Sequence, residues 1–163
     1  MPTGSPASAG SVVAVRRLLA VLALAVVVAV VAAAPARAQT ATKCTAFAVL
    51  KPGNEVPPAE SQASGATLVR INGTSVSFAT VIANPSRETF IAGHIPVGAA
   101  GVNGPIVVPL FAGSSDRRLF TQFETVTDPD APGICANPAG FYVNYHTTDF
   151  RAGAIRDQLT SLF

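Results

Sequence analysis

The two histidines of the chain, His94 and His146, are the side chains best suited to bind a metal ion. Imidazole is a common ligand of zinc and copper, but such sites usually take three or four nitrogen, oxygen or sulfur ligands. Pro96 follows His94 at the alternate strand position and is not a ligand, so Asp149 or a water molecule would have to complete the site. Two interpretations therefore stay open. The imidazoles bond separately to backbone groups, which the sequence favours, or they converge and bind copper or zinc.

Cys44 and Cys135 are the only cysteines, and they lie 91 positions apart. An even number of cysteines in an exported chain favours a disulfide, so we predict this bond. The alternative is a pair of buried free thiols. A metal site that uses both sulfur atoms lacks a neighbouring His or Cys at ligand spacing.

Other catalytic patterns are missing from the sequence. Gly98, Gly101 and Gly104 are followed by Pro105 and an apolar run rather than by a helix, so they do not form a phosphate-binding loop. We expect them to supply positive φ angles or close backbone approach. Gly-x-Ser-x-Gly and His-Glu-x-x-His are absent. The carboxylates of a glycosidase would have to come from residues that we interpret as solvated turn residues: Glu124, Asp128 and Asp130. We predict no enzymatic activity and no cofactor.

The N-terminus has the pattern of a secretory signal peptide. Arg16 and Arg17 precede an apolar run over 18–34, and Ala36-Arg37-Ala38 is a small-x-small cleavage site. The alternative is an uncleaved membrane anchor, but Pro35 and the alanine-rich run favour cleavage after Ala38. Removal of residues 1–38 takes away three of the 11 basic residues and leaves 8 against 9 acidic ones. A mature chain with so little net charge is not expected to bind nucleic acid or a membrane.

Residues 39–163 have the pattern of a single all-β domain. The chain has 13 glycines and 13 prolines, and its apolar runs are short and separated by turn signals. Asn72-Gly73 is the strongest hairpin signal, and after it Val76, Phe78, Thr80 and Ile82 alternate on one face. We predict an antiparallel β-sandwich or barrel of seven to eight strands. The expected strands are 44–50, 65–71, 75–83, 90–95, 105–111, 140–146 and 153–159, with an irregular region at 112–137 and a weak helix at 119–125.

Four motifs, in order, resemble the CHRD domain that is found in chordin and in many exported microbial proteins. They are Phe47-Ala-Val-Leu with Gly53-Asn-Glu-Val-Pro-Pro58, Ala92-Gly-His-Ile-Pro-Val-Gly98 with Gly101-Val-Asn-Gly-Pro, Tyr142-Val-Asn-Tyr-His-Thr147, and Gly153-Ala-Ile-Arg156. The similarity covers about residues 44–160. Two positions depart from the family pattern: Pro96 replaces a second histidine and Asp157 replaces a glycine. The resemblance implies an all-β module without an established enzymatic activity.

The residues within these motifs are the candidate site: Asn54, Glu55, Pro57, Pro58, His94, Gly98, Gly101, Asn103, Gly104, Tyr142, Asn144, His146 and Arg156. We expect Asn54 to close an Asx-type turn and Glu55 to be a solvated carboxylate. Arg156 alternates with Ile155 and is expected on an exposed or half-buried strand face, where a carboxylate such as Glu55 would pair with it.

These observations predict a secreted module of the extracellular space or cell envelope. It would bind or support an extracellular protein or an envelope component whose identity the sequence does not specify. The alternative function is a metal-binding or redox protein that uses His94 and His146.

Overall fold

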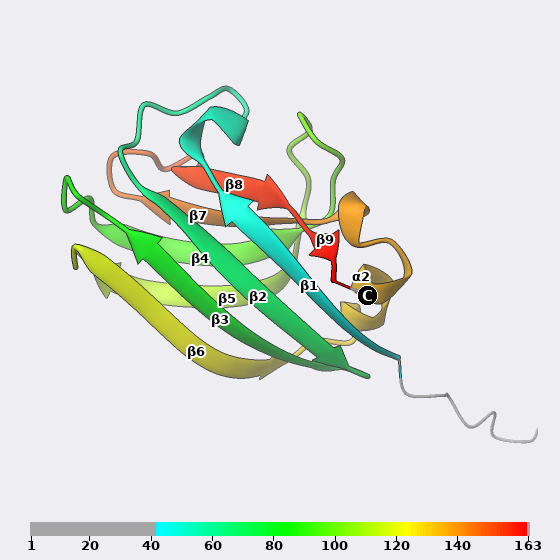
Figure 1. The fold of residues 1–163 in the computed structure, drawn as a ribbon. Helices are drawn as coiled ribbons and strands as arrows, with labels where there is room; N and C mark the ends of the chain where they lie inside the picture. Colours follow the sequence, from blue (N-terminus) through cyan, green and yellow to red (C-terminus); the bar gives the residue numbers. More distant parts are fainter. Residues whose placement is uncertain (1–41, 163) are drawn as a thin grey trace, which may run out of the picture. The chain divides into compact units, whose positions relative to one another are not determined.

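The computed structural model describes residues 42–162, which form two antiparallel β-sheets (Figure 1). The first sheet has the order β6-β3-β2-β1-β9, with β1 at Lys43–Leu50, β2 at Ser64–Asn72, β3 at Ser75–Ala83, β6 at Leu119–Thr127 and β9 at Thr160–Ser161. The second has the order β5-β4-β7-β8, with β4 at Phe90–Pro96, β5 at Ile106–Ser115, β7 at Tyr142–Thr147 and β8 at Ile155–Gln158. The predicted all-β class is confirmed, and the architecture is a sandwich rather than a closed barrel.

The alternation of side chains along β3 explains how the sequence builds the first sheet. Val76, Phe78, Thr80 and Ile82 are buried, as predicted, and the residues between them face outward. β2 and β3 pair in register from Asn72↔Ser75 onward. Gly73 has a φ of 60° and allows the tight turn that Asn72-Gly73 predicts.

Buried polar groups connect the two sheets across the core. The hydroxyl of Tyr145 on β7 donates to Thr80 Oγ1 at 2.9 Å and lies 3.2 Å from Gln122 Oε1 on β6. Gln122 in turn donates to the carbonyl of Leu110 at 2.8 Å. Because buried polar groups need partners, these bonds fix how the sheets lie on each other.

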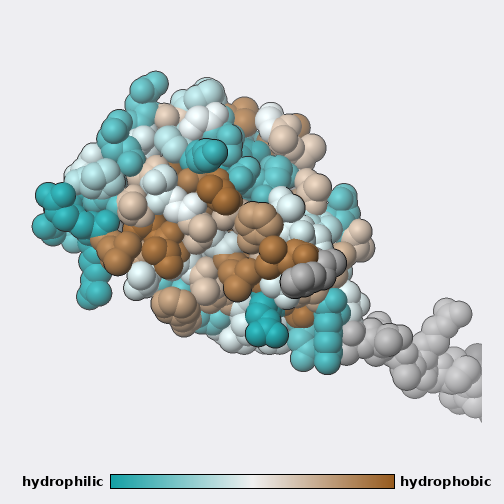
Figure 2. Space-filling view, viewed as in Figure 1, coloured by the Kyte–Doolittle hydropathy of each residue, from teal (hydrophilic) through white to brown (hydrophobic). Residues whose placement is uncertain are grey.

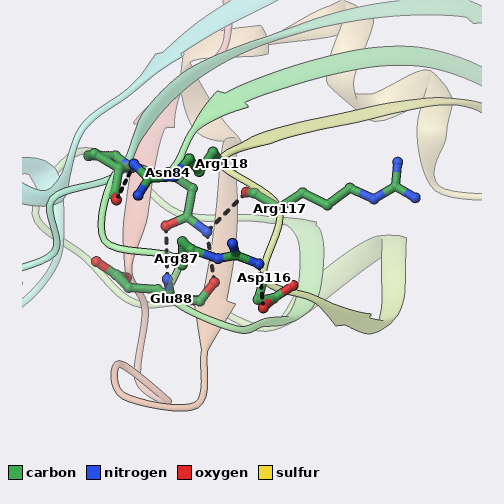
Figure 3. Close-up of polar contacts among 7 residues, drawn as sticks. Asn84, Arg87, Glu88, Asp116, Arg117 and Arg118 are labelled. Carbon is green, nitrogen blue, oxygen red and sulfur yellow. Dashed lines mark hydrogen bonds and ion pairs between the residues drawn. The ribbon is translucent and has the colours of Figure 1, made fainter.

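Asn84 joins the two turns that cross between the sheets (Figure 3). It is fully buried, and its amide donates to the carbonyls of Glu88 at 2.8 Å and Arg117 at 3.2 Å. Its Oδ1 accepts from the backbone N–H of Glu88 at 3.0 Å. The exposed ion pair between Arg87 and Asp116 spans the same two turns at 3.1 Å. One buried amide therefore ties the β3–β4 turn to the β5–β6 turn.

The region expected to be irregular, 112–137, is largely ordered secondary structure. The weak helix predicted at 119–125 is wrong, because these residues lie within strand β6. The sequence of β6 does not show the usual alternation of apolar and polar residues. Phe120 and the polar Gln122 point inward, whereas the apolar Leu119 and Phe123 are exposed. The helix of this region is α2 at Ala131–Ala136, which lies between β6 and the 3-10 helix η2 at Pro138–Gly140 and was not predicted.

The predicted disulfide joins Cys44 on β1 to Cys135 on α2, with a Cα–Cα separation of 5.5 Å. Ala131 and Ile134 of the same helix are fully buried in the core. No helix among residues 42–162 is long and apolar enough to cross a bilayer. The predicted signal peptide and its cleavage site after Ala38 lie outside the described residues.

Candidate functional site

The motif residues converge on the outer face of the four-stranded sheet. His94 on β4 lies opposite Asn144 on β7, and Asn144 lies opposite Arg156 on β8. Directly paired residues of antiparallel strands share a face, so these three side chains form a row. Arg156 also forms a bridge to Lys51, which leads into the short helix η1 at Pro52–Asn54. The sheet register thus brings motifs distant in sequence to one place.

The two histidines contact each other. His146 lies two residues after Asn144, on the same face, and its Nε2 is 2.7 Å from His94 Nε2. His146 Nδ1 lies 2.9 Å from the carbonyl oxygen of Arg151. The favoured expectation that each imidazole bonds separately to the backbone is confirmed for His146 Nδ1 and wrong for His94, whose ring contacts His146 instead. Diagonal neighbours on adjacent strands reach each other here.

Burial favours the neutral form of both histidines. It lowers the pKa of His94 from 6.5 to about 4, and the nearby His146 lowers it further in the same direction. Burial also lowers the pKa of His146, against the opposing effect of its bond to the Arg151 carbonyl. Neutral imidazole is the form that binds metals. Within residues 42–162, no group of three or more His, Cys, Asp or Glu side chains is placed to hold a metal ion, so Asp149 does not complete one.

Arg156 is buried, with 1% of its surface exposed, which contradicts the expected exposed or half-buried position. Its guanidinium stacks 3.8 Å from the ring centre of Tyr142. It donates to Asn103 Oδ1 at 2.8 Å and to the carbonyl of Val102 at 3.0 Å. The loop that follows β4 folds over this arginine, because the guanidinium satisfies two acceptors of the loop at once.

Glu55 is also buried, at 4% exposure, rather than solvated as expected. Its Oε1 has no hydrogen-bond partner, and no ion pair with Arg156 forms among the described contacts. Burial raises the pKa of Glu55 to about 7, although the positive charge of Arg156 lowers it. The carboxyl group lies against Gly153, where a side chain would overlap it.

The other motif residues position these loops. Asn54 donates to the carbonyl of Arg156 at 3.2 Å and to Asp157 at 3.1 Å, so its amide links two segments instead of closing its own Asx turn. Asn103 donates to the carbonyl of Val56 at 2.8 Å. Pro57 and Pro58 are exposed, and they line a hollow together with residues 149–153.

The three glycines of the loop act as predicted. Gly101 has a φ of 77°, and a Cβ on Gly104 would overlap the carbonyl oxygen of Val97. A Cβ on Gly98 would lie 3.2 Å from both the Tyr142 ring and the Val102 carbonyl. The backbone N–H of Gly104 donates to the Tyr142 hydroxyl at 3.1 Å. The loop therefore packs closely on Tyr142.

Asp157 is a site residue that the sequence analysis treated only as a departure from a motif. Its carboxylate accepts from Asn54, from the backbone N–H of Val49 at 3.3 Å and from its own neighbour Gln158 at 2.9 Å. It connects β8 with β1 and the loop after it. The only sequence signal was its position next to Arg156 at the closing motif.

The CHRD domain family model matches residues 46–159. The chain belongs to the CHRD domain family. No curated protein and no solved structure matches it. All the motif residues of the candidate site lie inside the CHRD match, and Cys44 lies just before it. In this CHRD domain, the polar residues of the motifs thus gather over the β4-β7-β8 part of the second sheet.

Proposed function

We propose that this CHRD protein is a secreted, non-enzymatic module that binds a protein or another component of the extracellular space or cell envelope. The binding surface would be the outer face of the five-stranded sheet. Two rows of outward-facing residues define it, and we call it the apolar face: Phe47, Leu68, Ala79 and Phe123 in one row, and Val49, Ala66, Val81 and Thr121 in the next.

The exposure of the apolar face carries the proposal. Phe123 is 71% exposed, and Val49, Leu68 and Val81 are each at least 40% exposed. Figure 2 shows hydrophobic surface running across this side of the molecule. The solvent side of an antiparallel sheet is normally polar, and contiguous exposed apolar patches mark interaction sites.

The absence of charge within the two rows indicates the chemistry of the partner. Neither row contains an acidic or basic residue, and the nearest charged side chain that faces outward on β2 is Arg70, in the adjacent row. A partner would therefore contribute apolar or aromatic side chains to the centre of the contact. Polar groups such as Ser77 and Thr125 would lie at its rim.

Other observations support export and a non-catalytic role. A disulfide between Cys44 and Cys135 is typical of proteins in oxidising compartments. The apolar run over 18–34 and the site at Ala36-Arg37-Ala38 support cleavage of a leader. The polar groups of Arg156 and Asn103 bond to loop atoms, which is a structural use of these side chains.

The test is capture of a partner from the extracellular and envelope fractions of the producing cells. The bait is the disulfide-bonded protein, compared with a Leu68→Ser/Phe123→Ser double variant. Because both side chains are exposed, we expect the variant to fold normally and to lose capture by at least tenfold. Ile106→Ser is the matched control, since Ile106 is 59% exposed on the other sheet.

The control should capture the same partner as the unchanged protein. Equal capture by the double variant would overturn the proposal. So would a purified protein that is already a dimer and becomes a monomer in the double variant, because a second copy would then occupy the apolar face.

A further inference from the structure

The hydrogen bonds of the histidine pair determine where its protons lie. A carbonyl oxygen only accepts, so His146 Nδ1, at 2.9 Å from the Arg151 carbonyl, carries a hydrogen. A neutral imidazole has one N–H, which leaves His146 Nε2 as a bare lone pair. The nitrogen 2.7 Å away, His94 Nε2, must then be the donor.

This arrangement leaves His94 Nδ1 as an acceptor with nothing to accept. That atom is buried and has no hydrogen-bond partner. The Oδ1 of Asn144, the residue directly opposite on β7, is also buried without a donor. Buried polar atoms are nearly always paired, so two unpaired acceptors on facing residues indicate that the site is incomplete.

A cation held by the two Nε2 atoms would complete the site. The proton of His94 would then be on Nδ1, where it becomes a donor on the residue that faces the unpaired Asn144 Oδ1. His146 would keep its Nδ1–H bond to the Arg151 carbonyl, which is the usual outer-shell support of a metal-binding histidine. We propose that His94 and His146 bind one Cu²⁺ or Zn²⁺ ion through their Nε2 atoms, with water molecules as the remaining ligands.

The geometry requires only a small adjustment. At metal–nitrogen distances of ~2.0–2.1 Å and a tetrahedral angle, the two Nε2 atoms lie ~3.3 Å apart. They are 2.7 Å apart without the ion, so the rings must separate by about 0.6 Å. Both side chains are half-buried, so one side of the pair is open to solvent and to an entering ion.

The choice of metal follows from the donor set. Two neutral imidazoles favour late first-row transition metals over Mg²⁺ or Ca²⁺, which prefer oxygen ligands. Both cysteines are bonded to each other, so no thiolate contributes. Cu²⁺ should bind more tightly than Zn²⁺, in the usual order of divalent affinities for nitrogen sites.

The test is calorimetric titration of the chelator-treated, disulfide-bonded protein with CuSO₄ and, separately, ZnSO₄. We expect one ion per chain, with Cu²⁺ the tighter. His94→Gln and His146→Gln should each weaken binding by roughly 100-fold or more, since even outer-shell changes cost ~10–100-fold. Asn144→Leu keeps both ligands and should weaken binding by ~10–100-fold, because it removes the acceptor for the Nδ1 proton.

A second measurement does not depend on the variants folding. In ¹⁵N spectra of the unchanged protein, Zn²⁺ should move the Nε2 signals of both histidines, transfer the His94 proton from Nε2 to Nδ1, and leave His146 Nδ1 protonated. Absence of binding at millimolar metal, unchanged binding in the His94→Gln/His146→Gln double variant, or Nδ1 coordination would each overturn the proposal. These results are independent of the apolar face, which lies on the other sheet.

Discussion

Glu55 is a carboxylic acid held in surroundings that favour its protonated form. It is buried, one of its oxygens has no partner, and its neighbour Gly153 leaves just enough space for the carboxyl group. Burial raises its pKa from 4.5 to about 7 even though Arg156 acts in the opposite direction. Near neutral pH, protonated and ionised forms of the Glu55 carboxyl group therefore both occur in the native structure.

This pKa shift predicts that the difference in free energy of unfolding between the unchanged protein and Glu55→Gln depends on pH. The folded-state pKa is raised, so the contribution of Glu55 to stability is full below pH 4.5 and is lost as the pH rises to about 7. The free energy of unfolding should fall over this range, relative to Glu55→Gln, by at most ~3.5 kcal/mol, because one pKa unit corresponds to ~1.4 kcal/mol. Urea unfolding of both proteins across this range measures the difference.

The comparison with Glu55→Gln is needed because the two histidines change the stability of the protein with pH in the opposite direction to Glu55. Their pKa values are lowered, so their contribution to stability is lost as the pH falls. Subtracting the two profiles removes this shared effect. A difference that does not change with pH would show that Glu55 is ionised in the native structure.

Residue type alone could not predict these environments. The sequence placed Glu55 in solvent and Arg156 on an exposed face, because charged side chains are rarely buried. The loop after β4 covers Arg156 through Asn103 and Val102, and the carboxyl group of Glu55 lies against Gly153. All of these contacts join residues more than 45 positions apart. Only the resemblance of motifs indicated that these residues belong to one site.

At the scale of elements, the hairpins were predictable and β6 was not. The alternation in β3 and the Asn72-Gly73 turn are local signals, and the structure confirms both. In β6, a polar Gln122 points inward to bond the Leu110 carbonyl while Phe123 points outward. That reversal removes the alternation from which a strand is predicted.

The disulfide predicts a clear loss of stability when it is removed. Cys135→Ser should lower the midpoint of thermal unfolding, because the bond closes a 91-residue loop whose chain entropy corresponds to about 4–5 kcal/mol. Ala131 and Ile134 still bury α2 in the core, so the variant should fold. Circular dichroism during heating measures the midpoint.

Cys44→Ser is the matched control for this prediction. Each single variant removes the same bond, so both should lower the midpoint by similar amounts, and the double variant should not lower it much further. Thiol titration of the unchanged protein, denatured without reductant, should detect no free thiol. Two reactive thiols per chain would refute the bond.

At the scale of the whole molecule, the two sheets present different outer faces. The four-stranded sheet carries the polar motif cluster under its loops, whereas the apolar face of the five-stranded sheet has no covering loop among the described contacts. The motifs in the sequence indicated the first of these faces, and the family match over residues 46–159 includes both. The second was not visible in the sequence, because it depends on the register that aligns Phe47, Leu68 and Phe123 across separate strands.

The proposed function depends most on export of the disulfide-bonded protein from the cell. Intact-mass spectrometry of the protein recovered from the medium or envelope of the producing cells tests it in one measurement. We predict the mass of a chain that begins at Gln39, allowing for cyclisation of that residue, and lighter by the two hydrogen atoms lost in the Cys44–Cys135 bond. A full-length chain that retains residues 1–38, or a chain with both thiols reduced, would contradict it.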